Sequence, residues 1–143
     1  MNKLPIHFFS EEINFKPKSV TALRSWIYQT ITLEKHELKE LNFIFCSDSY
    51  LLQINQQYLA HDTYTDIITF DHLDENGAIY GDIFISIDRI KENSKEFKTT
   101  FLNELHRVII HGTLHLLGYL DKNKVDKEIM TAKENQYLAI RAI

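Results

Sequence analysis

The sequence predicts a single α/β domain of the α+β kind, in which about five helices pack against a mixed sheet of about four strands. Short runs rich in Phe and Ile, typical of buried strands, alternate with longer stretches whose apolar residues recur at helical spacing. The 143 residues suffice for one continuous core. Since no repeat, low-complexity stretch or linker divides the chain, the predicted domain spans residues 1–143.

The first half of the chain is predicted to hold two strands and two helices. Residues 4–9 form a short strand, and Ser19 caps a helix that continues to about residue 34. The apolar run from Leu41 to Cys46 is a buried strand. Ser47-Asp48-Ser49 then offers N-cap residues for a helix that carries Leu51, Ile54 and Tyr58.

The second half is predicted to be a hairpin followed by three helices. A polar loop over 60–65 leads into a strand over 66–71. Asp74-Glu75-Asn76-Gly77 is a strong turn signal, so the partner strand covers 79–87. The helices follow at about 88–96, 100–117 and 124–142.

Composition excludes several classes of protein. Hydrophobic residues make up 44% of the chain, with only four glycines and two prolines, which is typical of a packed globular domain. Cys46 is the single cysteine, so an internal disulfide is excluded, and its apolar neighbours predict a buried thiol. No apolar run approaches the length of a membrane span, and the N-terminus lacks a signal-peptide core, so we expect a cytoplasmic protein.

One stretch, His111-Gly-Thr-Leu-His115-Leu-Leu-Gly118-Tyr-Leu-Asp121, points to a metal site. Histidines four apart on a helix project from one face, close enough to share an ion. Gly118 can take the left-handed conformation that ends a helix, which lets the chain bring Asp121 to the same ion. His111, His115 and Asp121 are therefore the predicted ligands and catalytic residues, on a helix resembling that of the metzincins. Three ligands leave a position open, as in catalytic zinc sites.

The position after the first histidine restricts the chemistry. In the hydrolytic zinc helix H-E-x-x-H a Glu stands there and serves as general base. Here that residue is Gly112. An ordinary metallopeptidase mechanism therefore lacks its proton acceptor, and a peptidase is the least favoured of the functions considered.

Other interpretations of these residues stay open. In the less favoured alternative, Asp121 is the N-cap of the following helix and the histidines are merely buried. Of the remaining histidines only His61 and His72, which flank a strand with polar neighbours, are candidates for supporting groups. Basic residues gather in two places, which are interpreted either as solvated helix faces or as nucleic-acid contacts: Arg89, Lys91, Lys95 and Lys98, then Lys122, Lys124, Lys127 and Lys133.

Three segments carry motifs of a known family. Residues 111–119, HGTLHLLGY, match the pattern HGxLHLxGY at every fixed position. Residues 58–70, YLAHDTYTDIITF, are similar to YR-x-x-D-x-PT-x-VLSF, and residues 81–86, GDIFIS, to GD-I-x-IS. Order and spacing agree over nearly the whole chain. The sequence thus resembles the YbeY family of bacterial ribosomal-RNA maturation factors, proposed to be zinc-dependent endoribonucleases.

Two departures from the family pattern bear on the chemistry. Asp121 stands where the family usually has a third histidine ligand, so the site resembles a two-His, one-carboxylate triad, which suits zinc but also iron, manganese or nickel. Leu59 replaces an arginine thought to engage RNA, and leucine cannot make the bidentate phosphate bonds of a guanidinium. Arg107 lies one turn before His111 and either substitutes for that arginine or pairs with Glu104.

The resemblance implies a metal-dependent, single-strand-specific endoribonuclease acting in ribosomal RNA maturation and ribosome quality control. One divalent ion, zinc by preference, would hold a water that serves as nucleophile. The expected partners are ribosomal RNA and the small ribosomal subunit, with neither DNA nor a membrane. Arg107, Tyr119, Lys122 and Lys124 are the candidate RNA contacts. The alternative is a non-catalytic ribosome-assembly factor that the metal merely stabilises.

Overall fold

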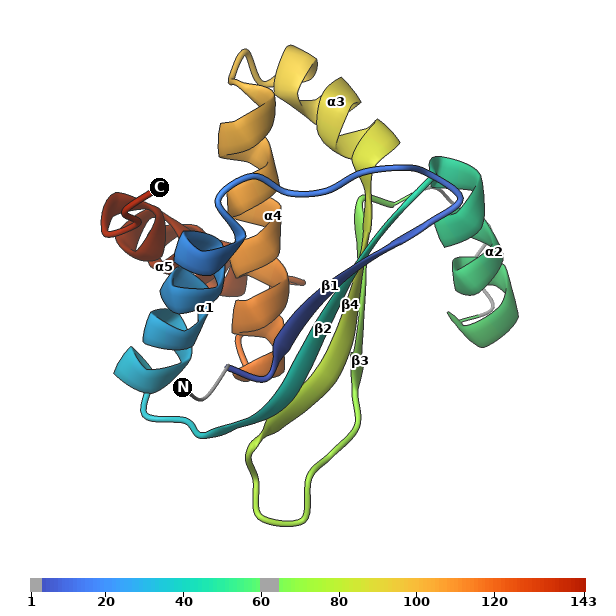
Figure 1. Ribbon diagram of the computed structural model, residues 1–143. Coiled ribbons are helices and arrows are strands. Elements are labelled where there is room, and N and C mark those ends of the chain that lie inside the picture. The colour runs from blue at the N-terminus through green and yellow to red at the C-terminus, as the bar shows by residue number, and fades with distance from the viewer. Residues whose placement is uncertain (1–3, 60–64) are drawn as a thin grey trace.

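Four strands form a mixed sheet in the order β1-β2-β4-β3 (Figure 1). The computed structural model describes residues 4–59 and 65–143. Strands β1 (Ile6–Glu11), β2 (Leu38–Cys46) and β4 (Ile79–Ser86) run parallel, whereas β3 (Ile67–Asp71) pairs antiparallel with β4. The predicted hairpin is confirmed: the Gly77 amide donates to the Asp74 carbonyl at 3.0 Å, and Gly77 takes a φ of 77°.

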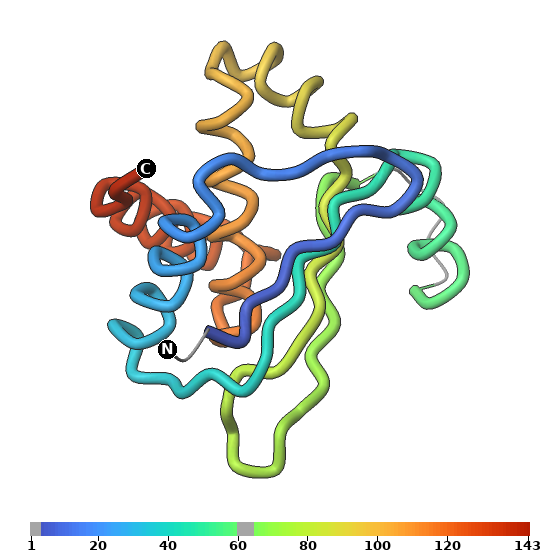
Figure 2. The backbone as a smooth tube through the Cα atoms, in the orientation of Figure 1, coloured from blue at the N-terminus to red at the C-terminus, as the bar shows by residue number. Residues whose placement is uncertain are grey.

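Four of the five helices in the described residues cover the two faces of this sheet. Helices α1 (Val20–Leu33), α4 (Phe101–Leu116) and α5 (Lys124–Ala139) lie on one side, and α2 (Asp48–Leu59) lies on the other (Figure 1). Helix α3 (Ile87–Glu96) continues directly from β4 and leads into α4. Figure 2 shows the segment over 12–19 crossing from the end of β1 to the start of α1. The predicted fold class and its count of elements are confirmed.

Side-chain alternation along the hairpin strands creates two apolar clusters. Ile83 and Ile85 face the main core, together with buried residues of α1, α4 and α5. Phe84 points to the opposite face and packs on a smaller cluster beneath α2, made by Cys46, Leu51, Ile54 and Ile68. This period of two is what a pleated strand imposes when both faces are covered. The predicted burial of the Cys46 thiol is confirmed.

One local prediction is wrong. Ser19 precedes α1, but its backbone is left-handed (φ 56°, ψ 48°) and its side chain makes no capping hydrogen bond. A capping serine needs an extended backbone to aim its hydroxyl at the first turn. On α2, Leu51 and Ile54 are buried, whereas Tyr58 is 64% exposed and its ring makes an edge contact with that of Phe70.

The predicted cap at the start of α2 is confirmed. Ser47 accepts from the Tyr50 amide at 3.1 Å, as an N-cap should. The predicted polar loop falls mostly on residues 60–64, outside the described part of the chain. Within the described residues, no helix has the length and apolar character needed to cross a membrane.

Candidate metal centre

Gly112 allows the histidine-bearing helix to lie directly on the sheet. A Cβ at this position would stand 2.7 Å from Cδ1 of Ile67 and 2.9 Å from Cγ2 of Ile83. Both distances are shorter than Cβ contacts normally are, so a larger residue here would require Ile67 and Ile83, or α4 itself, to shift. The position at which hydrolytic zinc helices carry their base is therefore a packing contact in this protein.

The end of α4 turns the chain back toward its own histidines. Gly118 has a φ of 106°, and its amide donates to the His115 carbonyl at 3.0 Å. The Tyr119 amide donates to the Leu114 carbonyl at 3.1 Å, which completes a Schellman motif. The reversal places Asp121 beside the histidine face of the helix.

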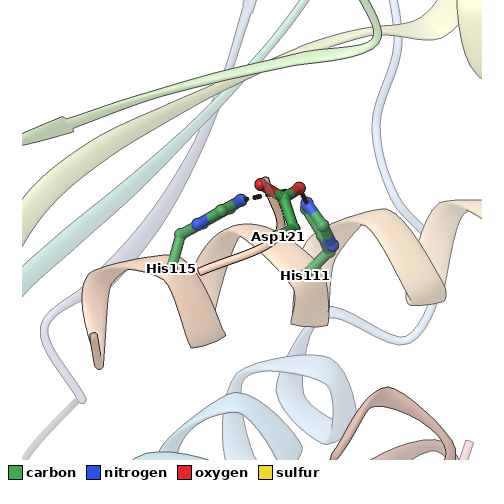
Figure 3. Close-up of side chains that lie close together, drawn as sticks. All are labelled: His111, His115 and Asp121. Atoms are coloured by element: carbon green, nitrogen blue, oxygen red, sulfur yellow. Dashed lines mark ion pairs between the residues drawn. The ribbon is translucent and has the colours of Figure 1, made fainter. Parts of the chain in front are cut away.

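The three predicted ligands converge (Figure 3). Oδ2 of Asp121 lies 3.2 Å from Nε2 of His111 and 3.3 Å from Nε2 of His115. One potential ligand atom from each residue lies within 4.8 Å of the others, so the cluster could hold a metal ion. Asp121 is not the cap of α5, because Asn123 fills that role by accepting from the Asp126 amide at 2.8 Å.

The hydrogen bonds of the two imidazoles leave the Nε2 lone pairs available to bind a cation. Nδ1 of His115 is 3.0 Å from the Tyr119 carbonyl, which can only accept. Nδ1 of His111 is 2.6 Å from Oε2 of Glu134. Each Nδ1 is therefore a donor, and in the neutral ring each Nε2 presents a lone pair to the Asp121 carboxylate. Three electron-pair donors face one another, which is the arrangement found around bound metals.

Charge around His111 also favours a cation. Burial lowers the pKa of this imidazole. The hydrogen bond to Glu134 and the charges of Glu134, Asp121 and Asp66 raise it by more, so the pKa of His111 lies above its ordinary value. These groups favour positive charge at the ring.

A cavity of about 110 Å³ adjoins His111 and contains groups that motif spacing did not identify. It is lined by Asp66, Glu104, Arg107, Val108, His111 and Glu134. Burial raises the pKa of Asp66, and burial together with the charge of Asp66 raises that of Glu104. Glu104 shares the helix face of His111, so helical spacing alone could have found it. Glu134 lies on α5 and carries no local signal that links it to the histidines.

The candidate RNA contacts differ in how they are held. Arg107 pairs with Oε1 of Glu134 and with Asn135, each at 2.8 Å, rather than with Glu104. Tyr119 is partly buried, and its hydroxyl donates to Glu34 at 2.5 Å. Lys122 and Lys124 follow Asp121 and are both exposed.

The remaining histidines lie in different settings. His72 pairs with Asp82 at 2.9 Å. His106 is buried, and its Nδ1 accepts from Arg141 at 2.9 Å. His61 lies outside the described residues.

Fold and site together define a class: a small α/β protein whose candidate centre joins a helix to the loop that follows it. Residues 6–141 match the sequence model of the family described as endoribonuclease YbeY. The chain is 49% identical to the endoribonuclease YbeY of Cytophaga hutchinsonii over 99% of both chains, and 49% identical to that of Bacteroides fragilis over 96% of this chain and 99% of the relative.

The fold of this chain is also similar to that of a solved structure. The solution structure of TM1509 from Thermotoga maritima is similar with a TM-score of 0.66 and 28% identity, covering 93% of this chain and 86% of that one. The chain belongs to the endoribonuclease YbeY family. It is accordingly a nuclease, within the hydrolases, and the resemblance seen in the sequence is confirmed.

Proposed function

We propose that this endoribonuclease depends on a metal ion held by His111, His115 and Asp121, and that it cleaves single-stranded ribosomal RNA during maturation and quality control of the small ribosomal subunit. The observation that supports metal dependence most is the orientation of the two imidazoles. Both Nδ1 atoms are turned to acceptors, so both Nε2 atoms face the Asp121 carboxylate. Action on ribosomal RNA would place the protein in the cytoplasm.

Zinc is the proposed ion, because two imidazole nitrogens and one carboxylate oxygen form a borderline donor set that suits it. When bound at a site with an open position, such an ion lowers the pKa of water and polarises a phosphoryl oxygen. Asp121 contributes a negative charge that a third histidine would not. It therefore reduces the net positive charge of the centre.

The residues around the centre would hold the RNA. Lys122 and Lys124 project into solvent directly after Asp121, where their ammonium groups can reach phosphates next to the reacting one. Arg107 and Tyr119 are proposed as weaker contacts, since the guanidinium is already paired with Glu134 and the phenol hydroxyl with Glu34.

A cleavage assay tests the proposal. Wild-type protein should cleave a single-stranded fragment of small-subunit ribosomal RNA, lose that activity with a chelator, and regain it with zinc. The variant His111→Ala should be inactive with an unchanged circular dichroism spectrum. Full activity in that variant would refute the proposal.

The second candidate is a non-catalytic assembly factor stabilised by the metal. It is favoured by the packing of Gly112, which stands at the position where hydrolytic zinc helices carry their Glu base, and by Leu59, which ends α2 without the family's usual arginine. Under this alternative, chelation would abolish binding to the small subunit and lower the melting temperature. Cleavage by the wild type would never exceed that of a mock preparation.

A further inference from the structure

Glu134 joins the candidate metal centre to Arg107 through one carboxylate. Its Oε2 is 2.6 Å from Nδ1 of His111, and its Oε1 is 2.8 Å from Nη1 of Arg107. The two partners lie one turn apart on α4, whereas Glu134 reaches them from α5 and is only 7% exposed. The carboxylate is therefore held at both ends by groups on the facing helix.

The chemistry of the two partners determines what this contact does. Arginine has donors and no acceptor, so Oε1 must accept. The other oxygen of an ionised carboxylate can also only accept, so Nδ1 of His111 carries the hydrogen. The lone pair of the neutral ring is then on Nε2, which is the atom directed at Asp121.

We propose that Glu134 is a positioning residue that fixes the metal-binding tautomer of His111, and that Arg107 fixes the orientation of Glu134. This inference rests on the metal site of the proposed function. Glu134 contacts the nitrogen that faces away from Asp121, so it would act through His111 and not as a ligand. Partners of this kind commonly change metal affinity about 10–100-fold when they are removed.

The arginine makes the effect of an isosteric amide predictable. In Glu134→Gln, one end of the side chain becomes a donor. Arg107 requires the amide oxygen, so the amide nitrogen is turned to Nδ1 of His111. Nδ1 of His111 must then accept the hydrogen bond, so the hydrogen of the neutral ring moves to Nε2. A hydrogen on Nε2 blocks metal binding at that atom. Without the arginine the amide is free to turn, and its oxygen can again accept from Nδ1.

The experiment measures zinc affinity by competition with a chromophoric chelator for wild type, Glu134→Gln, Arg107→Met and the double variant. We expect Glu134→Gln to bind zinc at least about tenfold more weakly. The double variant should recover most of the lost zinc affinity. Adding Arg107→Met to Glu134→Gln should therefore raise zinc affinity by a larger factor than the same substitution changes the affinity of the wild type. Such non-additivity would not arise if Glu134 merely packed the two helices together.

Two controls make the outcome decisive. Glu104→Gln alters another buried carboxyl of the same cavity, 6% exposed, and should leave zinc affinity within about threefold of the wild type. Thermal unfolding of each apoprotein shows whether the variants fold. Wild-type affinity in folded Glu134→Gln, or a double variant no tighter than the additive value, would overturn this inference alone. Wild-type protein that binds no zinc would overturn the proposed metal site as well.

Discussion

Nδ1 of His115 donates to the backbone carbonyl of Tyr119 at 3.0 Å, so the loop that ends α4 also orients one of the helix's own imidazoles. The same loop continues to Asp121. The hydroxyl of Tyr119 donates to Glu34, next to the end of α1, which anchors the loop to a second helix. A single turn therefore supplies one proposed ligand, orients another and is itself held in place.

Replacing Gly118 should weaken the centre and the fold together. Gly118→Ala meets no atom within 4 Å, so its cost comes from the backbone, whose φ is 106°. Strain of this kind costs about 1–3 kcal/mol. Urea unfolding should show that loss, and zinc affinity should fall because the Tyr119 carbonyl shifts. Gly77→Ala is the matched control, with a φ of 77° and equally open surroundings in the hairpin turn. It should lose similar stability with zinc affinity unchanged; equal effects on zinc would contradict this role of the turn.

Restoring the peptidase base should damage the fold rather than create a peptidase. Gly112→Glu forces a side chain toward Ile67 and Ile83, where even a Cβ would stand at 2.7 and 2.9 Å. Overpacking of a core typically costs about 1–3 kcal/mol, and a charged group adds a desolvation penalty. We expect a much lower urea midpoint than for wild type. A stable variant that hydrolyses a peptide library would show that α4 has room for the base.

His106 should make the stability of the apoprotein pH-dependent. Burial, followed by the charge of Arg141, lowers its pKa from 6.5 to about 4. A base whose pKa is lowered by folding takes up protons more readily when unfolded. Stability from this group is therefore fully present above about pH 6.5 and is lost as the pH falls toward 4, by up to about 3 kcal/mol.

The variant His106→Asn tests this dependence of stability on pH, because the amide oxygen of asparagine can still accept from Arg141. Urea unfolding of chelator-treated protein between pH 4 and 6.5 should give a flatter profile for the variant than for wild type. Comparing the two also removes the contribution of His111, which has the opposite sign. Parallel profiles would show that His106 is not the group responsible.

The exposed lysines after Asp121 should contribute salt-sensitive RNA binding. Lys122→Gln/Lys124→Gln should weaken binding to a single-stranded RNA and lower the slope of log K against log salt by about 0.7 for each phosphate that is no longer neutralised. Lys91→Gln/Lys95→Gln removes the same charge from the exposed face of α3 and should have little effect. Equally weakened binding in the two double variants would indicate that only net charge matters.

Much of this structure could be predicted because its signals are local. Apolar patterns, caps and turn signals predicted the helices and strands found in the described residues, and the glycine after the second histidine predicted the reversal that brings Asp121 to the histidines. Ser19 failed as a cap because the chain enters α1 in a left-handed conformation, which side-chain identity does not determine. Glu134 could not be found, because its contacts depend on how α5 packs on α4. The same packing determines that Arg107 pairs with the carboxylate of Glu134.

The most direct test of the metal-dependent mechanism is to titrate zinc back into chelated wild-type protein and Asp121→Ala while cleavage of a single-stranded ribosomal RNA fragment is followed. For wild type, we expect cleavage to rise with bound zinc and to stop rising at about one equivalent. Asp121→Ala should require far more zinc for any cleavage. Cleavage by chelated wild type at the full rate, or identical titrations for the two proteins, would contradict a catalytic centre built from His111, His115 and Asp121.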